Sequence, residues 1–164
     1  MSSTGEGYRG YTVAYGGLEK DGRAYHQKAT TFEGDRDRSF VLLAKEDSVG
    51  TAIHEWGHVI EHQHPSIGTA AWAFLRKRVG EEPTVALTEV CPECKYESHE
   101  RGRKDNFEAA FGSHAHYVGK DYGGRATEIM SMGLEKLYKD PVTFAKKDPE
   151  YFNFVVDILH GKIP

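Results

Sequence analysis

The order of patterns along the chain predicts an α+β fold, in which helices pack on one side of a small sheet. Three strand-like segments come first, at residues 11–15, 23–31 and 39–44, with glycine-containing breaks between them. Segments with the apolar spacing of helices follow. The 164 residues suffice for one domain with a core but not for two ordinary ones. We therefore expect a single domain over residues 11–164, preceded by a flexible N-terminus at residues 1–10.

The helical segments are marked by apolar periodicity and by capping residues. Two Asp-Pro pairs, Asp140-Pro141 and Asp148-Pro149, each place a capping aspartate before a proline, which fits the first turn of a helix. The other candidate caps are Ser48 or Thr51 for the first helix and Thr127 for the third. The expected helices span residues 49–63, 69–79 and 127–139, a short segment from Asp140-Pro141, and 150–160.

Composition and charge exclude two classes of partner. The net charge of −4 is mild, and no face is basic enough to indicate nucleic acid as the main partner. The sequence has no run of 18 apolar residues, so we expect no membrane-spanning segment. The first seven residues lack the charged and apolar regions of a secretory signal. These features indicate a soluble, cytoplasmic protein.

The pentapeptide His54-Glu55-Trp56-Gly57-His58 carries the clearest chemical signal. On a helix, His54 and His58 are four residues apart, so they project from one face and can share a metal ion. Neutral imidazoles suit zinc, and Glu55 is close enough to reach a metal-bound water without binding the metal. The apolar residues of this helix indicate that it is half buried; they are Ala52, Trp56, Val59 and Ile60.

A catalytic zinc usually takes three protein ligands and leaves a fourth position for water. His64 lies six residues past His58, as in three-histidine sites, but position 61 is glutamate rather than the glycine that ends the helix there. His62 lies too far up the same face. A glutamate on a downstream helix is the other arrangement, which favours Glu128, with Glu135 as its competitor seven residues later.

Several downstream segments resemble a known family. They are Tyr117-Val-Gly-Lys-Asp-Tyr122, the stretch from Thr127 to Glu135, Asp140-Pro141, and Asp148-Pro-Glu-Tyr-Phe152. Together with the His-Glu-x-x-His helix and residues 72–78, they are similar to the phage-associated zincin-like domain. That domain occurs in phage minor head and head-morphogenesis proteins and in related bacterial proteins. The resemblance covers residues 38–161. It implies a minimal, gluzincin-type zincin with Glu128 as the third ligand.

The expected mechanism assigns a role to each candidate. His54, His58 and Glu128 hold Zn²⁺, and Glu55 takes a proton from the metal-bound water as it attacks a peptide carbonyl. The oxyanion needs a further donor. Tyr122 is the first candidate and Tyr117 the second, followed by His114 and His116, whereas Lys120 is expected to be a solvated charge. Possible partners for the second nitrogen of each imidazole are Asp121, Glu61 and Ser131.

Residues 81–125 show little periodicity and are expected to form a long loop, functional or mobile. The two cysteines lie in it as Cys91-Pro-Glu-Cys94. We expect free thiols. The alternatives are a reversible disulfide and a second metal site completed by His99 with His114 or His116. This segment is a departure from the family pattern.

These patterns indicate a hydrolase, specifically a zinc metalloprotease that cleaves a protein or peptide substrate, with a phage or host protein as its target. A virion-associated location is an alternative to the cytoplasm. The rival hypothesis is a catalytically inactive zinc-binding module that serves in a phage-type assembly, because a zincin fold does not establish activity.

Overall fold

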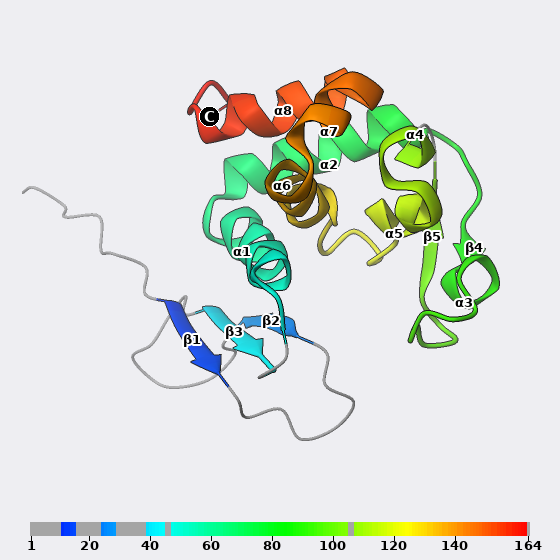
Figure 1. Cartoon of the computed structure of the whole chain (residues 1–164), viewed down its shortest axis with the longest axis horizontal. Coiled ribbons are helices and arrows are strands. Elements are labelled where there is room, and N and C mark those ends of the chain that lie inside the picture. The colour runs from blue at the N-terminus through cyan, green and yellow to red at the C-terminus, as the bar shows by residue number, and fades with distance from the viewer. Residues whose placement is uncertain (1–10, 16–23, 29–38, 45–46, 105–106, 164) are drawn as a thin grey trace, which may run out of the picture.

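The computed structural model describes residues 11–15, 24–28, 39–44, 47–104 and 107–163. Helices and two small sheets form an α+β fold, which confirms the predicted class (Figure 1). The expected flexible segment, residues 1–10, lies outside the described residues. Within them, no helix is both long and apolar enough to cross a membrane.

The first sheet is formed by the three N-terminal strands, close to where the sequence predicts them. Its order is β1-β3-β2, with β1 parallel and β2 antiparallel to the central strand. Tyr11 pairs with Ser39, and Tyr25 with Leu42. The strands are β1 (Tyr11–Tyr15), β2 (Tyr25–Lys28) and β3 (Ser39–Leu43). The second strand is therefore shorter than the expected 23–31; of the rest, Ala24 is not in a strand, and residues 23 and 29–31 lie outside the described residues.

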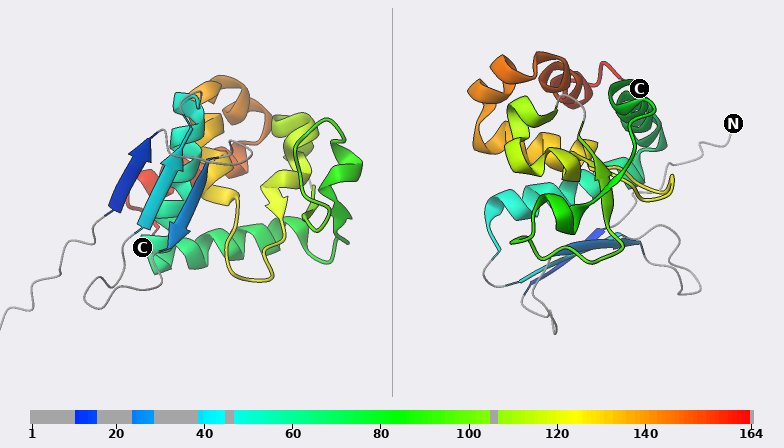
Figure 2. Two further views of the ribbon diagram at one scale, coloured as in Figure 1. Left: turned by 90° about the horizontal axis from the view of Figure 1, so that it is seen from below. Right: turned by 90° about the vertical axis from the view of Figure 1, so that its right-hand side faces the viewer.

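Helix α1 (Val49–Gln63) has the predicted bounds and forms the centre of the fold. Ser48 caps it, because the Ser48 Oγ accepts a hydrogen bond from the Thr51 backbone N–H at 3.1 Å. One side of α1 packs on the first sheet, and the other side packs on α6 (Ile129–Lys139), so α1 lies between them (Figures 1 and 2). The sheet side buries Val59 against Val41 and Leu43, with Ala52 and Trp56 packed around them.

Helix α2 (Pro65–Val79) begins four residues earlier than the sequence pattern suggests. His64 ends α1 and directly precedes Pro65, which occupies the first turn of α2. The two helices are thus joined by a single residue. The buried residues of α2 are Ala71, Phe74, Leu75 and Val79.

The stretch 81–125, expected to be one long loop, instead contains short helices and strands among its described residues, so that prediction was wrong. It contains a second, antiparallel sheet of order β4-β5-β6 and several one-turn helices. Elements of two to four residues are too short to show periodicity, and the strand pairing is not local in sequence. The elements are β4 (Val85–Ala86), α3 (Leu87–Val90), β5 (Arg101–Arg103), α4 (Glu108–Phe111), the 3₁₀ helix η2 (Gly112–His114), α5 (Ala115–Val118) and β6 (Gly119–Lys120).

The C-terminal helices are α7 (Pro141–Lys147) and α8 (Pro149–Leu159), and both begin at the predicted Asp-Pro pairs. Asp140 accepts a hydrogen bond from the Thr143 N–H, and Asp148 accepts one from the Tyr151 N–H, which confirms both caps. The main core lies between α2, α6 and these helices. At its centre, the fully buried Tyr151 contacts four phenylalanine rings: Phe74, Phe107, Phe111 and Phe144.

Candidate metal centre

Helices α1 and α6 bring three predicted ligands together. His54 and His58 project from one face of α1, and Glu128 occupies the position directly before α6. The Nε2 atoms of both histidines lie 3.3 Å from the same oxygen, Oε2 of Glu128. One potential ligand atom from each residue lies within 4.8 Å of the others. Residues 70 or more apart in sequence thus converge on one point.

The spacing of these atoms fits a small divalent ion. In a tetrahedral zinc site, metal–ligand bonds of about 2.0–2.1 Å separate neighbouring ligand atoms by about 3.3–3.4 Å. The two His–Glu128 separations of 3.3 Å match this edge length. Two imidazoles and one carboxylate are also the donor types that zinc accepts. The residues present therefore fit a zinc ion, and His54, His58 and Glu128 are the residues that would hold it.

Gly57 allows the two helices to approach closely enough for this arrangement. A Cβ atom at Gly57 would lie only 2.4 Å from the Ser131 Cα and 2.5 Å from the Ser131 backbone nitrogen. Because these are backbone atoms, they cannot move aside as a flexible side chain can. A residue with a side chain at position 57 would thus push α6 away from His54 and His58.

Glu128 is fully buried and held from two sides. The Tyr122 hydroxyl donates a hydrogen bond to Oε1, and the Ser131 Oγ donates one to Oε2. Burial alone would raise the pKa of Glu128, but His58 and His54 hold this pKa well below its usual range. The carboxylate is therefore charged and oriented, as a metal ligand must be.

Glu135, which the sequence analysis treated as a competitor of Glu128 for the third metal ligand, contacts His54 instead. Its Oε2 lies 3.1 Å from His54 Nδ1, on the far side of the ring from Glu128. A carboxylate in this position accepts the Nδ1–H and leaves Nε2 free to bind a metal. The sequence contained a signal for this role, because Glu135 lies seven residues after Glu128 and thus on nearly the same face of the helix.

The partners that the sequence suggested for the imidazoles have other contacts. Glu61 accepts hydrogen bonds from the Thr127 hydroxyl at 2.6 Å and the Met130 N–H at 3.0 Å, so it anchors the start of α6 to α1. Ser131 supports Glu128, as described above. Asp121 accepts a hydrogen bond from the Gly123 N–H. His64, the rejected third ligand, is exposed at the junction of α1 and α2.

Glu55 is buried next to the three ligands, with 6% of its surface exposed. Burial raises its pKa, and the nearby His58 and His54 oppose this increase only in part. A carboxylate with a raised pKa is a stronger proton acceptor. This position therefore suits the predicted general base.

The two histidines hold protons firmly while no metal competes for them. Burial lowers the pKa of His54, but hydrogen bonds with Glu128 and Glu135 outweigh it and raise this pKa to about 10. The pKa of His58 is also raised: burial again opposes the shift, and the charge of Glu128 overcomes it. A metal ion that binds here must displace these protons.

The four candidate oxyanion donors differ in position. Tyr117 and His114 line a cavity of about 360 Å³ together with His54. The Tyr117 ring is stacked near His54, with 6.1 Å between ring centroids. The Tyr122 hydroxyl, in contrast, donates to Glu128. His116 is half-buried elsewhere, where burial and Lys104 lower its pKa. A cavity of about 650 Å³ over Arg78 and Asp148 includes none of the predicted site residues.

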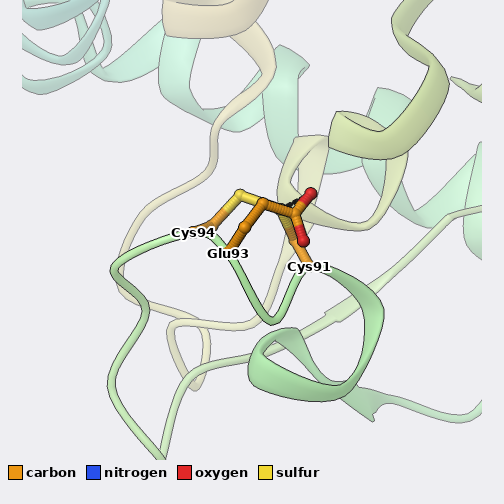
Figure 3. Close-up of a disulfide and its surroundings, with 3 residues drawn as sticks. All are labelled: Cys91, Glu93 and Cys94. Atoms are coloured by element: carbon orange, nitrogen blue, oxygen red, sulfur yellow. Dashed lines mark hydrogen bonds between the residues drawn. A yellow bond between two sulfur atoms is a disulfide. The ribbon is translucent and has the colours of Figure 1, made fainter.

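The two cysteines form a disulfide, so the prediction of free thiols was wrong. Cys91 and Cys94 are bonded through their sulfur atoms, with Cα atoms 5.3 Å apart (Figure 3). Glu93 lies next to them, and the three side chains could form a metal-binding group. Thiolates are the sulfur ligands of metals, however, and cysteines bonded to each other have none. We therefore describe the pair as a disulfide that closes a short turn.

Comparison with known proteins gives no relative on which to base a function. The chain matches no protein-family model, no curated protein and no solved structure. The resemblance to the phage-associated zincin-like domain stays a prediction. The geometry of the site is therefore the basis on which we infer a function.

Proposed function

We propose that the chain is a zinc-dependent peptidase. The observation that supports this most strongly is that His54, His58 and Glu128 converge with the spacing of zinc ligands, while Glu55 is buried beside them. A bound zinc ion would supply a Lewis acid that polarises a carbonyl group and lowers the pKa of water. Proton transfer and stabilisation of the oxyanion depend on residues of this chain.

Glu55 acts as the general base and then as the general acid. It accepts a proton from the attacking water and delivers it to the leaving amine, so it returns to its starting state at the end of the cycle. Its burial supports this role, because burial raises the pKa of Glu55 and makes the carboxylate a stronger proton acceptor. Glu128 is a ligand and Glu135 orients the His54 ring, and neither carboxylate takes part in proton transfer.

Tyr117 is now the preferred donor to the oxyanion, ahead of Tyr122. Tyr117 lines the cavity that includes His54, whereas the Tyr122 hydroxyl already donates a hydrogen bond to Glu128. His114 lines the same cavity and is the second candidate. Apolar residues also line this cavity, namely Ala110, Phe111 and Met132, and Glu135 lies on its wall beside His54.

A zinc-binding module without activity is the alternative. The near-complete burial of Glu128 and His54 would also suit an ion that only stabilises the fold. A structural zinc normally has four protein ligands. Among the described residues, His54, His58 and Glu128 form the candidate ligand group without a fourth His, Cys, Asp or Glu ligand. A zinc ion held by three protein ligands would keep one coordination position open for water, which favours the enzyme.

The two functions are separated by the Glu55→Gln variant. We expect the zinc-loaded wild-type chain to cleave members of an unbiased peptide library, and Glu55→Gln to keep its zinc and lose at least about 100-fold in rate, because it lacks the base. Glu81→Gln, at an exposed glutamate, is the matched control and should retain full activity. Zinc binding without cleavage by the wild type would favour the module.

A further inference from the structure

Lys120 is a buried charge that the proposed mechanism does not use. It lies on β6, and its ammonium group forms an ion pair with Glu100, with only 10% and 8% of the two side chains exposed. The sequence predicted a solvated lysine at this position, which was wrong. Removing two charges from water is costly, and such a pair is weak evidence for stability alone. A role in orienting its neighbours would account for it better.

Two tyrosine rings flank the ammonium group of Lys120. Its Nζ lies 4.6 Å from the centroid of the Tyr122 ring and 5.1 Å from that of the Tyr117 ring. A cation and the face of an aromatic ring attract each other, and this attraction is stronger where water is excluded. One buried charge therefore favours a single orientation for both rings.

Both rings contact the candidate metal centre. The Tyr122 hydroxyl donates a hydrogen bond to Oε1 of Glu128. The Tyr117 ring is stacked near the His54 ring, with 29° between the two ring planes. Because Oε1 is occupied by Tyr122, it is Oε2 that faces His54 and His58. The Tyr122 hydroxyl on Oε1 and the Ser131 hydroxyl on Oε2 thus together fix how Glu128 is presented, and the position of the Tyr122 ring sets the first of these hydrogen bonds.

We propose that Lys120 is a positioning residue for the metal centre, which acts through Tyr122 to orient Glu128. The second sheet then has a function, because β6 carries Lys120 and Glu100 lies directly before β5. This inference rests on the proposed metal site but does not require peptidase activity.

The test is a double-mutant cycle on zinc affinity, measured by competition with a chelator of known affinity. Lys120→Met with Glu100→Gln removes both charges together, so that neither is left buried without its partner. The glutamine carbonyl can still accept the hydrogen bond that Glu100 receives from the Glu97 N–H. Tyr122→Phe removes the hydroxyl and keeps the ring.

Loss of a residue that supports a metal ligand typically weakens metal affinity by about 10- to 100-fold. We expect about tenfold from Tyr122→Phe and a similar loss from the Lys120/Glu100 pair variant. The two changes together should weaken zinc binding no more than Tyr122→Phe alone. The absorption bands of bound Co²⁺ should shift in the same way in both variants, which a general loss of stability would not produce.

Lys104→Met with Glu108→Gln is the matched control, since it removes an exposed Lys–Glu pair from the surface. Its zinc affinity should equal that of the wild type. Losses that multiply in the combined variant, or unchanged affinity in the Lys120/Glu100 variant, would overturn this inference while the proposed function stands. A wild-type chain that binds no zinc would overturn both. Cleavage activity does not enter the test, so an inactive chain with coupled losses would support the inference alone.

Discussion

Gly57 lies between the two candidate ligand histidines, at a point where α1 and the backbone of α6 are in direct contact. We expect Gly57→Ala to weaken zinc binding by at least tenfold and to destabilise the metal-free fold by about 1–3 kcal/mol, the usual cost of overpacking. Chelator competition and urea denaturation measure the two effects.

Gly50→Ala is the matched control on the same helix. A Cβ atom there would meet the end of the flexible Lys139 side chain, which can move aside. Its zinc affinity should remain at the wild-type value. If Gly57→Ala bound zinc as tightly as Gly50→Ala, the close approach of the helices would not be what sets the ligand geometry.

His54 should give the metal-free protein a distinctive pH dependence. Hydrogen bonds with Glu128 and Glu135 outweigh burial and raise its pKa from 6.5 to about 10. Because the folded-state pKa is the higher one, the protonated ring stabilises the fold; this contribution is complete below pH 6.5 and is lost as the pH rises through about 10.

An NMR titration of the histidine rings in metal-free protein measures this pKa. Glu135→Gln should lower the midpoint of His54, because the glutamine carries no negative charge to stabilise the imidazolium. An unchanged midpoint would show that Glu135 does not hold the ring.

Zinc binding at pH 7 should also release protons, which calorimetry in buffers of different ionisation enthalpy detects.

The roles of single residues differed in how far the sequence could predict them. The His54, His58 and Glu55 arrangement follows from helix geometry, because four-residue spacing places side chains on one face. Glu128 could be selected as a candidate by its place at the start of a predicted downstream helix, although the helix itself begins at Ile129. The seven-residue spacing puts Glu135 on nearly the same face as Glu128. Its contact with His54, and that of Tyr122 with Glu128, still depend on how distant segments pack, which no local pattern specifies.

At the scale of elements, the buried ion pair between Arg78 on α2 and Asp148 at the start of α8 connects distant parts of the chain. The guanidinium donates two hydrogen bonds of 3.0 Å to the carboxylate, which also caps α8. We expect Arg78→Met to lower the free energy of unfolding by about 3–5 kcal/mol, because it leaves a buried charge without its partner. Chemical denaturation measures this loss.

Lys77→Met provides the comparison, since Lys77 pairs with Glu150 on the exposed surface nearby. Its loss should cost about 0–1 kcal/mol, as is usual for exposed pairs. Equal costs for the two variants would contradict the importance of the buried pair.

Elements were predictable where local signals specify them. The bounds of α1 and the starts of α7 and α8 follow from caps and prolines, whose hydrogen bonds involve neighbouring residues. Strands β4, β5 and β6 have two or three residues each and pair across a gap of about 15 residues or more. Their formation depends on contacts that periodicity cannot reveal. The Cys91–Cys94 disulfide lies in the same region, but its spacing is local. The sequence offered it only as an alternative, because Cys-x-x-Cys is also compatible with free thiols and with a metal site.

At the scale of the whole molecule, the two sheets lie on different sides of α1 and α6, the helices around the candidate metal centre (Figures 1 and 2). The first sheet packs against α1 behind His54 and His58, and the second carries Lys120, close to Tyr117 and Tyr122. Helix α6 supplies Glu135 and follows Glu128 directly. The candidate metal centre is therefore the place where the separate parts of the fold meet.

The zinc content of the purified chain after dialysis, measured by mass spectrometry, tests the central claim most directly. We predict one zinc ion per chain in the wild type and in Glu55→Gln and His64→Ala, and loss of most of the zinc in His58→Ala and Glu128→Ala. Full zinc content in Glu128→Ala, together with loss in His64→Ala, would contradict the assignment of the site.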